Sequence, residues 1–254
     1  MSLTVASFFW LDTARQRNVQ ITPDDVRIWR NMVERNLSVP HRIVCVTHRP
    51  DLIDFMETIP LDMAKHVPGT CLVKLQAHKI GGVAKEGDRV LLMDVDCVVT
   101  GSLDPLNQYS ITNEFTDYSF VGWRNPNYEQ GGRRGFYQGS LQLFTVGATE
   151  FLWSDFEPKR DMAWLNRRFG GAEQCWISER LNTEFPKAGW EWDRPYFTEA
   201  DGIYGAGRLF NGTMGKGVTS ELPDNARIVF TPGDRKPGTP EFVKNHPWSV
   251  EYWK

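Results

Sequence analysis

One segment, Arg89–Asp96 (RVLLMDVD), limits the folds open to this chain more than any other. Its apolar residues follow one another without the alternation of a half-exposed strand, which is typical of a central strand buried on both faces of a sheet. Strands and helices alternate up to about residue 100, a pattern that predicts βαβ units with right-handed crossovers. We therefore expect an α/β/α sandwich with a mainly parallel central sheet.

Local patterns place the other elements. Thr22 can cap a helix that begins at Pro23, because a threonine side chain accepts backbone N–H bonds and proline suits the first helical position. Apolar residues then recur at helical spacing as far as Leu37. Other runs predict strands at 4–11, 41–47, 117–124, 139–147 and 226–230, helices at 51–59, 71–82 and 172–185, and mostly turns in the Gly-rich stretch 197–221.

Length and composition narrow the function classes. The 254 residues, 41% hydrophobic and 24% charged, have the composition of an ordinary globular protein. A net charge of -3 gives no general attraction for nucleic acid or acidic membranes. No run reaches the roughly 18 apolar residues of a transmembrane helix, and the N-terminus lacks the basic region of a signal peptide. Four widely separated cysteines argue for a reducing compartment, so we expect a cytoplasmic protein without a disulfide framework or structural zinc.

Asp94 and Asp96 stand where the apolar strand should end. In open α/β sheets, ligands bind beyond the carboxyl ends of the strands. If the chain stays extended there, alternation points both side chains to the same side. Two carboxylates together with phosphate oxygens and water form an ordinary Mg²⁺ or Mn²⁺ site. The alternative is that the two aspartates cap a turn or pair with an arginine.

The surrounding sequence resembles a known family. Residues 71–106, which contain the Asp-x-Asp and a following GSLDPL turn, resemble nearly end to end the metal-binding core of GT-A glycosyltransferases. The likeness is closest to the glycogenin-like and bacterial lipopolysaccharide galactosyltransferase type. Further blocks match in the same order, at 21–47, 137–148, 170–181 and 226–237. The resemblance implies a GT-A (Rossmann-like) fold in a single domain, 1–254, with a nucleotide-binding half (1–107) and an acceptor-side half with the closing segment (108–254).

The resemblance also implies roles for particular residues. Asp96 would coordinate a Mn²⁺ or Mg²⁺ that bridges the diphosphate of the donor, and Asp94 would share the metal or contact the ribose. Lys236, in a turn that contains Gly233, would neutralise the leaving diphosphate, a role that suits a cation because negative charge develops there. Lys74 could help to bind phosphate. From the residues alone, Lys236 could equally be a solvated surface lysine, and Lys74 an ordinary position on a surface helix.

Other positions match groups around the base and the sugars. Asp12 and Thr13 follow the first strand and match contacts of the uridine base, although a simple strand-to-loop transition would look the same. Glu173 and Gln174 match the pair that faces the acceptor sugar and the reacting carbon. For Glu173, capping of a helix N-terminus is the alternative.

Two small residues and one departure complete the comparison with the family. Gly139 and Ser140 align with small residues that let the donor sugar approach the backbone. The family has a third metal ligand, a histidine, at the position of Phe230, and a phenyl ring cannot ligate a metal. The diphosphate and water could complete the metal's shell, His246 could substitute, or metal dependence could be weak. His246 is expected to pack near Trp248 as a structural residue.

The resemblance to this family implies an enzyme that transfers a sugar from a nucleotide donor, a UDP-sugar, to an acceptor hydroxyl, with metal assistance and retention of configuration. The acceptor could be a glycan, a lipid-linked sugar or a hydroxymethylated base of DNA. Basic residues among aromatic ones suit a phosphate backbone with flipped bases. They are Arg133, Arg134, Lys159, Arg160, Arg167 and Arg168, near Tyr128, Phe136, Trp164 and Phe169. Two other functions stay open, a phosphatase of the haloacid-dehalogenase type and a non-catalytic protein that binds sugar nucleotides or glycans.

Overall fold

The computed structural model of the protein describes residues 2–11, 21–108, 120–124, 137–169, 173–184, 196–206, 220–231 and 236–254. The chain forms two compact units whose segments interleave along the sequence. Unit 1 comprises Met1–Arg15, His41–Met93 and Ser110–Tyr196, and unit 2 comprises Gln16–Pro40, Asp94–Tyr109 and Phe197–Lys254. The division into a nucleotide-binding half, 1–107, and an acceptor-side half, 108–254, stays a prediction.

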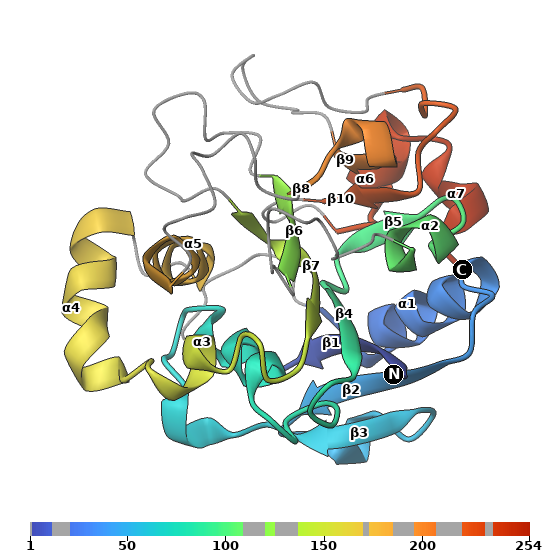
Figure 1. Ribbon diagram of the computed structural model, residues 1–254. Helices are drawn as coiled ribbons and strands as arrows, with labels where there is room; N and C mark the ends of the chain where they lie inside the picture. Colours follow the sequence, from blue (N-terminus) through green and yellow to red (C-terminus); the bar gives the residue numbers. More distant parts are fainter. Residues whose placement is uncertain are drawn as a thin grey trace. The chain divides into compact units, whose positions relative to one another are not determined.

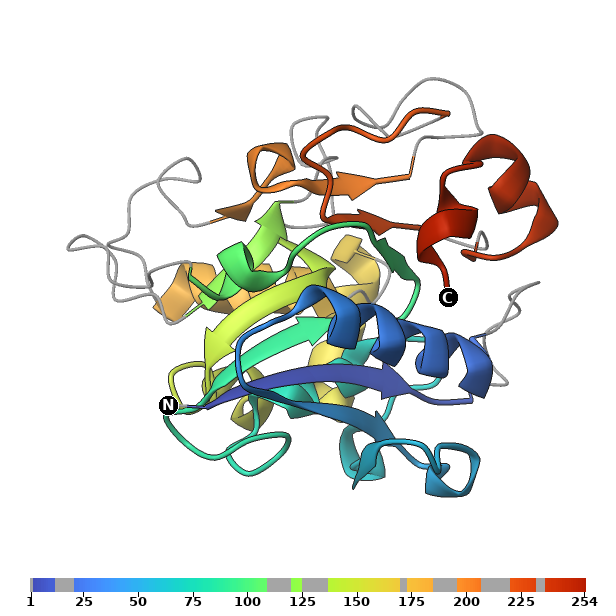
Figure 2. The ribbon, with the colours of Figure 1, turned by 90° about the vertical axis from the view of Figure 1, so that its right-hand side faces the viewer.

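Unit 1 is built on a seven-stranded sheet with the order β3-β2-β1-β4-β7-β6-β8. Strands β1, β2, β3 and β4 pair in parallel, whereas β7 pairs antiparallel with both β4 and β6. Figure 2 shows β1, β2 and β4 running side by side in one direction and β7 running against them. The bounds are β1 (Leu3–Phe9), β2 (His41–Thr47), β3 (Glu57–Pro60), β4 (Arg89–Met93), β6 (Phe120–Arg124), β7 (Tyr137–Thr145) and β8 (Tyr196–Phe197). The expected mainly parallel sheet with a central, buried β4 is confirmed.

The helical segments of unit 1 are 3-10 helices before β4 and α-helices after β7 (Figure 1). They are η1 (Pro50–Leu52), η2 (Met63–Lys65), η3 (Leu72–His78), α3 (Phe151–Ser154), α4 (Pro158–Phe169) and α5 (Glu173–Glu184). The predicted helix over 51–59 is wrong, because only one 3-10 turn forms and the chain then adds β3 to the edge of β2. The predicted helix over 71–82 is a shorter 3-10 helix, η3.

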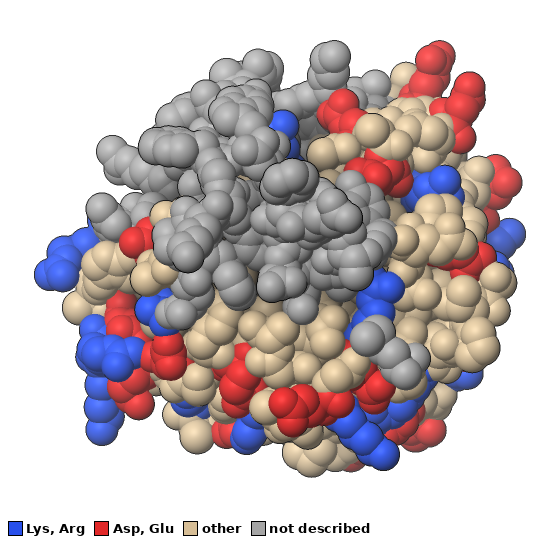
Figure 3. Space-filling model, viewed as in Figure 1, with Lys and Arg blue, Asp and Glu red and all other residues tan. Residues whose placement is uncertain are grey.

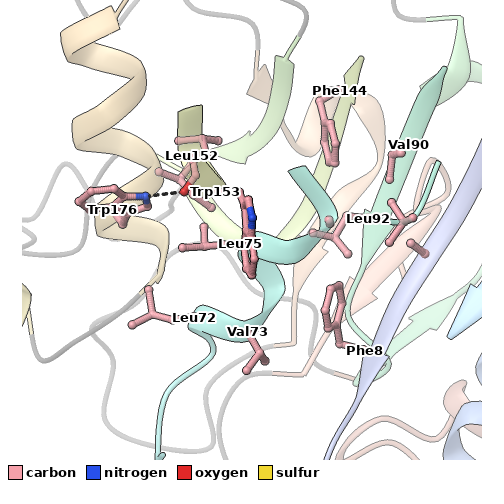
Figure 4. Close-up of a cluster of buried hydrophobic side chains, with 14 of the residues drawn as sticks. Phe8, Leu72, Val73, Leu75, Val90, Leu92, Phe144, Leu152, Trp153 and Trp176 are labelled. Atoms are coloured by element: carbon pink, nitrogen blue, oxygen red, sulfur yellow. Dashed lines mark hydrogen bonds between the residues drawn. The ribbon is translucent and has the colours of Figure 1, made fainter. Parts of the chain in front are cut away.

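A cluster of buried apolar side chains holds η3, α3, α4 and α5 to the sheet (Figure 4). Phe8 of β1 and Leu92 of β4 lie in this cluster together with Leu75 of η3. Trp176 of α5 joins it and donates its indole N–H to the backbone oxygen of Leu152 in α3, at 2.9 Å. This bond satisfies the one polar atom that the buried ring carries, so the tryptophan adds apolar burial without an unpaired donor.

Unit 2 contains helix α1 and a three-stranded sheet with the order β5-β10-β9. Strand β10 pairs antiparallel with β5 and parallel with β9. The bounds are α1 (Pro23–Asn36), β5 (Cys97–Val99), α2 (Asp104–Asn107), η5 (Glu199–Asp201), β9 (Ile203–Gly205), β10 (Ile228–Phe230), α6 (Pro240–Asn245) and α7 (Ser249–Tyr252). Across the described stretches of both units, no helix is long and apolar enough to cross a membrane.

Helix α1 begins as its sequence predicts. The Thr22 hydroxyl accepts the backbone N–H of Asp25 at 3.2 Å, and the Asp25 carboxylate accepts the backbone N–H of Thr22 at 2.7 Å. This capping box satisfies two donors that a helix start would otherwise leave unpaired. At its other end, Ser38 donates its N–H and its hydroxyl, both at 2.7 Å, to the Asp104 carboxylate. The ends of α1 are therefore fixed by side chains and not by backbone bonds alone.

Candidate functional site

The first group of candidate residues lies in unit 2, on the loop between β4 and β5. The chain leaves β4 at Asp94, and Val95 and Asp96 form a bend. The backbone N–H of Cys97 donates to the oxygen of Val95 at 2.9 Å. The chain is therefore not extended between the two aspartates, so the alternation of side chains along a strand does not apply there. Both are partly exposed, while Val95 and Cys97 are buried.

The Cys97 thiol lies beneath this bend and donates to the backbone oxygen of Asp94 at 3.2 Å. Burial, reinforced by the neighbouring carboxylates of Asp96 and Asp94, raises the pKa of the thiol well above its usual value. The thiol therefore stays neutral at physiological pH. It supports the bend by this hydrogen bond and as a small, buried group.

Asp96 is held by residues that follow β10. The backbone N–H and the hydroxyl of Thr231 both donate to the backbone oxygen of Asp96, at 3.0 and 2.8 Å. The Lys236 ammonium forms an ion pair with the Asp96 carboxylate. The side chain of Lys236 is 5% exposed and that of Asp96 is 22% exposed. Lys236 is thus no solvated surface lysine, and its buried charge is compensated by the second aspartate of the Asp-x-Asp.

The turn after Lys236 depends on a glycine. The hydroxyl of Thr239 donates to the backbone oxygen of Lys236 at 2.9 Å. Between them, Gly238 has a φ of +81°, in the left-handed region that side chains disfavour. A Cβ on Gly238 would also lie 2.5 Å from the indole nitrogen of Trp253. Glycine at this position therefore permits the turn that places the ammonium of Lys236 against Asp96.

Asp94 and Asp96 fit a divalent cation only with help from other ligands. Carboxylate oxygens suit Mn²⁺ and Mg²⁺, which often take their remaining ligands from phosphates and water. Phe230 is buried in β10 opposite Cys97 and offers no donor atom. Within the described residues, no group of three or more His, Cys, Asp or Glu side chains could hold a metal. Asp94 and Asp96 could therefore supply only part of the ligand set of such a metal.

His246 does not replace the missing histidine. It is buried, with its ring 4.4 Å from that of Phe242 and 5.7 Å from that of Trp248. Its expected packing near Trp248 is confirmed, and the aromatic neighbours suit a structural role.

The second group of candidate residues lies in unit 1 and centres on a buried ion pair. Lys74 of η3 and Glu173 of α5 are joined at 2.8 Å, with side chains 3% and 8% exposed. The Lys74 ammonium also donates to the backbone oxygen of Gly139 in β7, at 3.1 Å. Lys74 is therefore not on a surface helix. Glu173 lies in the first turn of α5, as the capping alternative expects, but its carboxylate is committed to Lys74.

The Glu173 side chain lies so close to the backbone of residue 139 that only glycine fits there. A Cβ on Gly139 would lie 2.3 Å from the Oε1 atom of Glu173. The next residue in β7, Ser140, is half-buried, and Gln174 is buried beside Glu173. The prediction that Gly139 and Ser140 admit the donor sugar stays a prediction. Here the space that a side chain at Gly139 would fill is taken by the carboxylate of Glu173.

A buried polar network that the sequence did not predict adjoins this ion pair at Gly139. His78 of η3 is fully buried, with its Nε2 atom 3.0 Å from Oε1 of Gln142 and its Nδ1 atom 2.9 Å from the hydroxyl of Thr149. Gln142 also donates to the backbone oxygen of Gly139 at 3.2 Å. Burial lowers the pKa of His78 to about 3, so the ring is neutral. The signal available in the sequence was Gln142, a polar residue between two leucines of β7.

Several predicted residues lie outside the described part of the chain, namely Asp12, Thr13 and Gly233 with Arg133, Arg134, Tyr128 and Phe136 of the basic and aromatic stretch, and the side chains of Arg168 and Phe169. On α4, Lys159 and Arg167 are exposed, and Arg160 pairs with Asp161 at 2.7 Å. In Figure 3, acidic side chains lie among the basic ones where α4 lies in Figure 1. This part of the surface therefore has no single sign of charge.

No protein-family model matches the chain, and no curated protein sequence does. In three dimensions the chain is similar to the galactosyltransferase LgtC, solved in complex with donor and acceptor sugar analogues. The TM-score is 0.56 and the identity 13%, over 94% of this chain and 91% of that one. A structure of an active-site mutant of LgtC gives a TM-score of 0.57 at 12% identity, with the same coverage. Similarity at this level of identity shows the fold, and the GT-A fold expected from the sequence is confirmed.

Proposed function

We propose that the protein is a glycosyltransferase that moves a sugar from a nucleotide donor, a UDP-sugar, to an acceptor hydroxyl with retention of configuration. The fold it shares with a galactosyltransferase supports this reading. The observation that carries it is the buried ion pair between Lys236 and Asp96. Burying a lysine ammonium costs free energy unless a partner compensates it, so a protein that only needed stability would gain little from this pair. A site that must receive a diphosphate gains a fixed cation.

In unit 2, the proposed role of this chain is to hold the diphosphate. Asp94 and Asp96 would bind a Mn²⁺ or Mg²⁺, whose positive charge would stabilise the departing diphosphate. The Lys236 ammonium would add a second positive charge, fixed in place before the reaction so that little reorganisation is needed as negative charge develops. Phe230 supplies no metal ligand. We therefore expect Lys236 to neutralise more of the charge of the diphosphate than a lysine would beside a metal held by three protein ligands.

In unit 1, the proposed role is to orient the acceptor. Glu173 and Gln174 begin α5, and the pairing of Glu173 with Lys74 fixes the direction of its carboxylate. A fixed acceptor of hydrogen bonds can hold a sugar hydroxyl in the orientation needed for attack. Holding reactants in such an orientation removes much of the entropic part of the barrier. The acceptor would be a glycan, a lipid-linked sugar or a modified base in DNA, and the mixed charge around α4 favours the first two.

One observation favours a second candidate, a protein that binds a sugar nucleotide without turnover. That observation is Phe230, which removes a metal ligand from the position opposite Cys97. Such a protein would bind UDP-sugars and release no UDP from them. The phosphatase reading is weaker, because the galactosyltransferase fold spans 94% of the chain.

Isothermal titration of UDP, with and without Mn²⁺, tests the proposed function. We expect UDP to bind the wild type, more tightly with Mn²⁺, and binding to weaken sharply in Asp96→Ala. Asp51→Ala is the matched control, because Asp51 is an exposed aspartate of unit 1 that also pairs with a basic side chain, that of half-buried Arg49. If UDP does not bind, or if neither Mn²⁺ nor Asp96→Ala changes its affinity, the proposal is wrong.

A further inference from the structure

Two polar side chains, His78 of η3 and Gln142 of β7, lie where apolar residues would be expected. Both are at most 1% exposed. The His78 ring lies 4.2 Å from the ring of Phe144 and 6.2 Å from that of Phe120. Gln142 is flanked along the strand by buried leucines. Buried polar groups cost free energy unless they are hydrogen-bonded, and even then an apolar core of the same shape is about as stable. Stability alone therefore does not explain this pair.

The hydrogen bonds of the two residues have one consistent direction. The backbone oxygen of Gly139 can only accept, so the Gln142 amide nitrogen donates to it and the Gln142 amide oxygen faces His78. His78 must then donate from Nε2, which leaves Nδ1 to accept the hydroxyl of Thr149. Of the two neutral tautomers, only the Nε2–H form satisfies all three bonds, and burial, which lowers the pKa of His78 to about 3, keeps the ring neutral. The chain of donors therefore starts at Thr149 and ends at the backbone of Gly139.

At Gly139 this chain meets the ion pair. The same backbone oxygen accepts from Lys74 at 3.1 Å and from Gln142 at 3.2 Å. Lys74 holds Glu173 at 2.8 Å, and the Glu173 carboxylate takes the space of the absent side chain at Gly139. A rotation of the Gly139 peptide would therefore displace the ammonium and the carboxylate together.

We propose that His78 and Gln142 are positioning residues, which set the orientation of Glu173 for sugar transfer by fixing the Gly139 carbonyl to which Lys74 is bound. The inference rests on the proposed function, because the orientation of Glu173 matters for turnover only in a transferase. Loss of the two residues should lower kcat by about 10- to 100-fold, the cost of misplacing a reacting group by about 1 Å. The affinity for UDP should change little, because Asp96 and Lys236 are held by their own contacts within unit 2.

The test replaces the whole network with apolar groups of similar shape, in the variant His78→Phe/Gln142→Leu/Thr149→Val. Removing all partners at once leaves no buried donor unpaired among them, so the free energy of unfolding should stay near that of the wild type. Leu143→Met, a volume-conserving change at the next residue of β7, is the matched control. The measurements are urea unfolding, UDP affinity by calorimetry, and the rate of UDP release from a UDP-sugar at varied donor concentration.

A folded variant with wild-type UDP affinity, a donor KM within about twofold and a reduced kcat supports the inference. A folded variant with wild-type kcat overturns it. If the wild type neither binds UDP nor releases it, the proposed function fails, and the inference fails with it.

Two further measurements apply if the triple variant does not fold. Gln142→Glu keeps an acceptor for His78 but cannot donate to Gly139, so it should show the same loss of kcat; an unchanged kcat overturns the inference. Nitrogen NMR of the wild type should find His78 neutral and protonated at Nε2 at pH 7. A charged ring or a proton at Nδ1 would contradict the hydrogen-bond chain on which the proposal stands.

Discussion

Acidification should destabilise this protein through His78. Burial lowers the pKa of His78 from 6.5 to about 3, so the folded protein keeps the ring neutral where the unfolded chain binds a proton. The contribution of the neutral ring to the free energy of unfolding is fully present above pH 6.5. It is lost as the pH falls from 6.5 toward 3. Between pH 7 and pH 5, the two pKa values give a loss of about 2 kcal/mol in the free energy of unfolding.

Urea unfolding at pH 7 and pH 5, for the wild type and for His78→Gln, measures this loss. Glutamine does not titrate, and its amide can still donate toward Gln142 and accept from Thr149. The other four histidines are present in both proteins, so their contribution cancels in the comparison. We expect the wild type to lose about 2 kcal/mol more than the variant between the two pH values. Equal losses in the two proteins would refute the reasoning.

Three further predictions concern the two groups of candidate residues. Gly139→Ala should cost about 1 to 3 kcal/mol of unfolding free energy, because its Cβ would meet the Glu173 carboxylate, while Ser140→Ala should cost less. Glu173→Leu should cost about 3 to 5 kcal/mol by leaving the Lys74 ammonium buried without its partner, and Glu173→Leu/Lys74→Met should recover most of that loss in the same urea assay. If the single and double variants are equally unstable, the unpaired Lys74 ammonium is not the cause of the lost stability. Lys236→Met should weaken UDP binding by about tenfold or more in calorimetry, since a hydrogen bond to a charged group is lost; unchanged affinity would remove Lys236 from the diphosphate site.

Most of the secondary structure was predictable because it is set locally. Helix α1 carries its own start signal in Thr22, Pro23 and Asp25, and the capping box forms as those residues require. Strand β3 was not predictable from its sequence, because Glu57–Pro60 becomes a strand only by pairing with the edge of β2. The bend at Val95 and Asp96 was also not predictable from the local sequence. It is held by hydrogen bonds from Thr231, a residue far away in the sequence, to the backbone oxygen of Asp96.

The candidate site was predictable in its residue types but not in its connections. The resemblance to a family singled out Lys74, Glu173 and Gly139, and the structure brings these three into contact. The bonds from His78 to Gln142 and Thr149 join residues 64 and 71 positions apart, which no spacing rule covers. A buried polar network of this kind becomes visible only when the strand and the 3-10 helix are packed together.

The most direct test of the central claim is the release of UDP from UDP-sugars. The protein is incubated with Mn²⁺ and a panel of UDP-sugars, with and without simple sugar acceptors, and free UDP is measured over time. The account predicts release from at least one UDP-sugar, faster with an acceptor, and lost in Asp96→Ala/Lys236→Met although that variant stays folded. Absence of release from every UDP-sugar in the panel, or equal release by the variant, would contradict it.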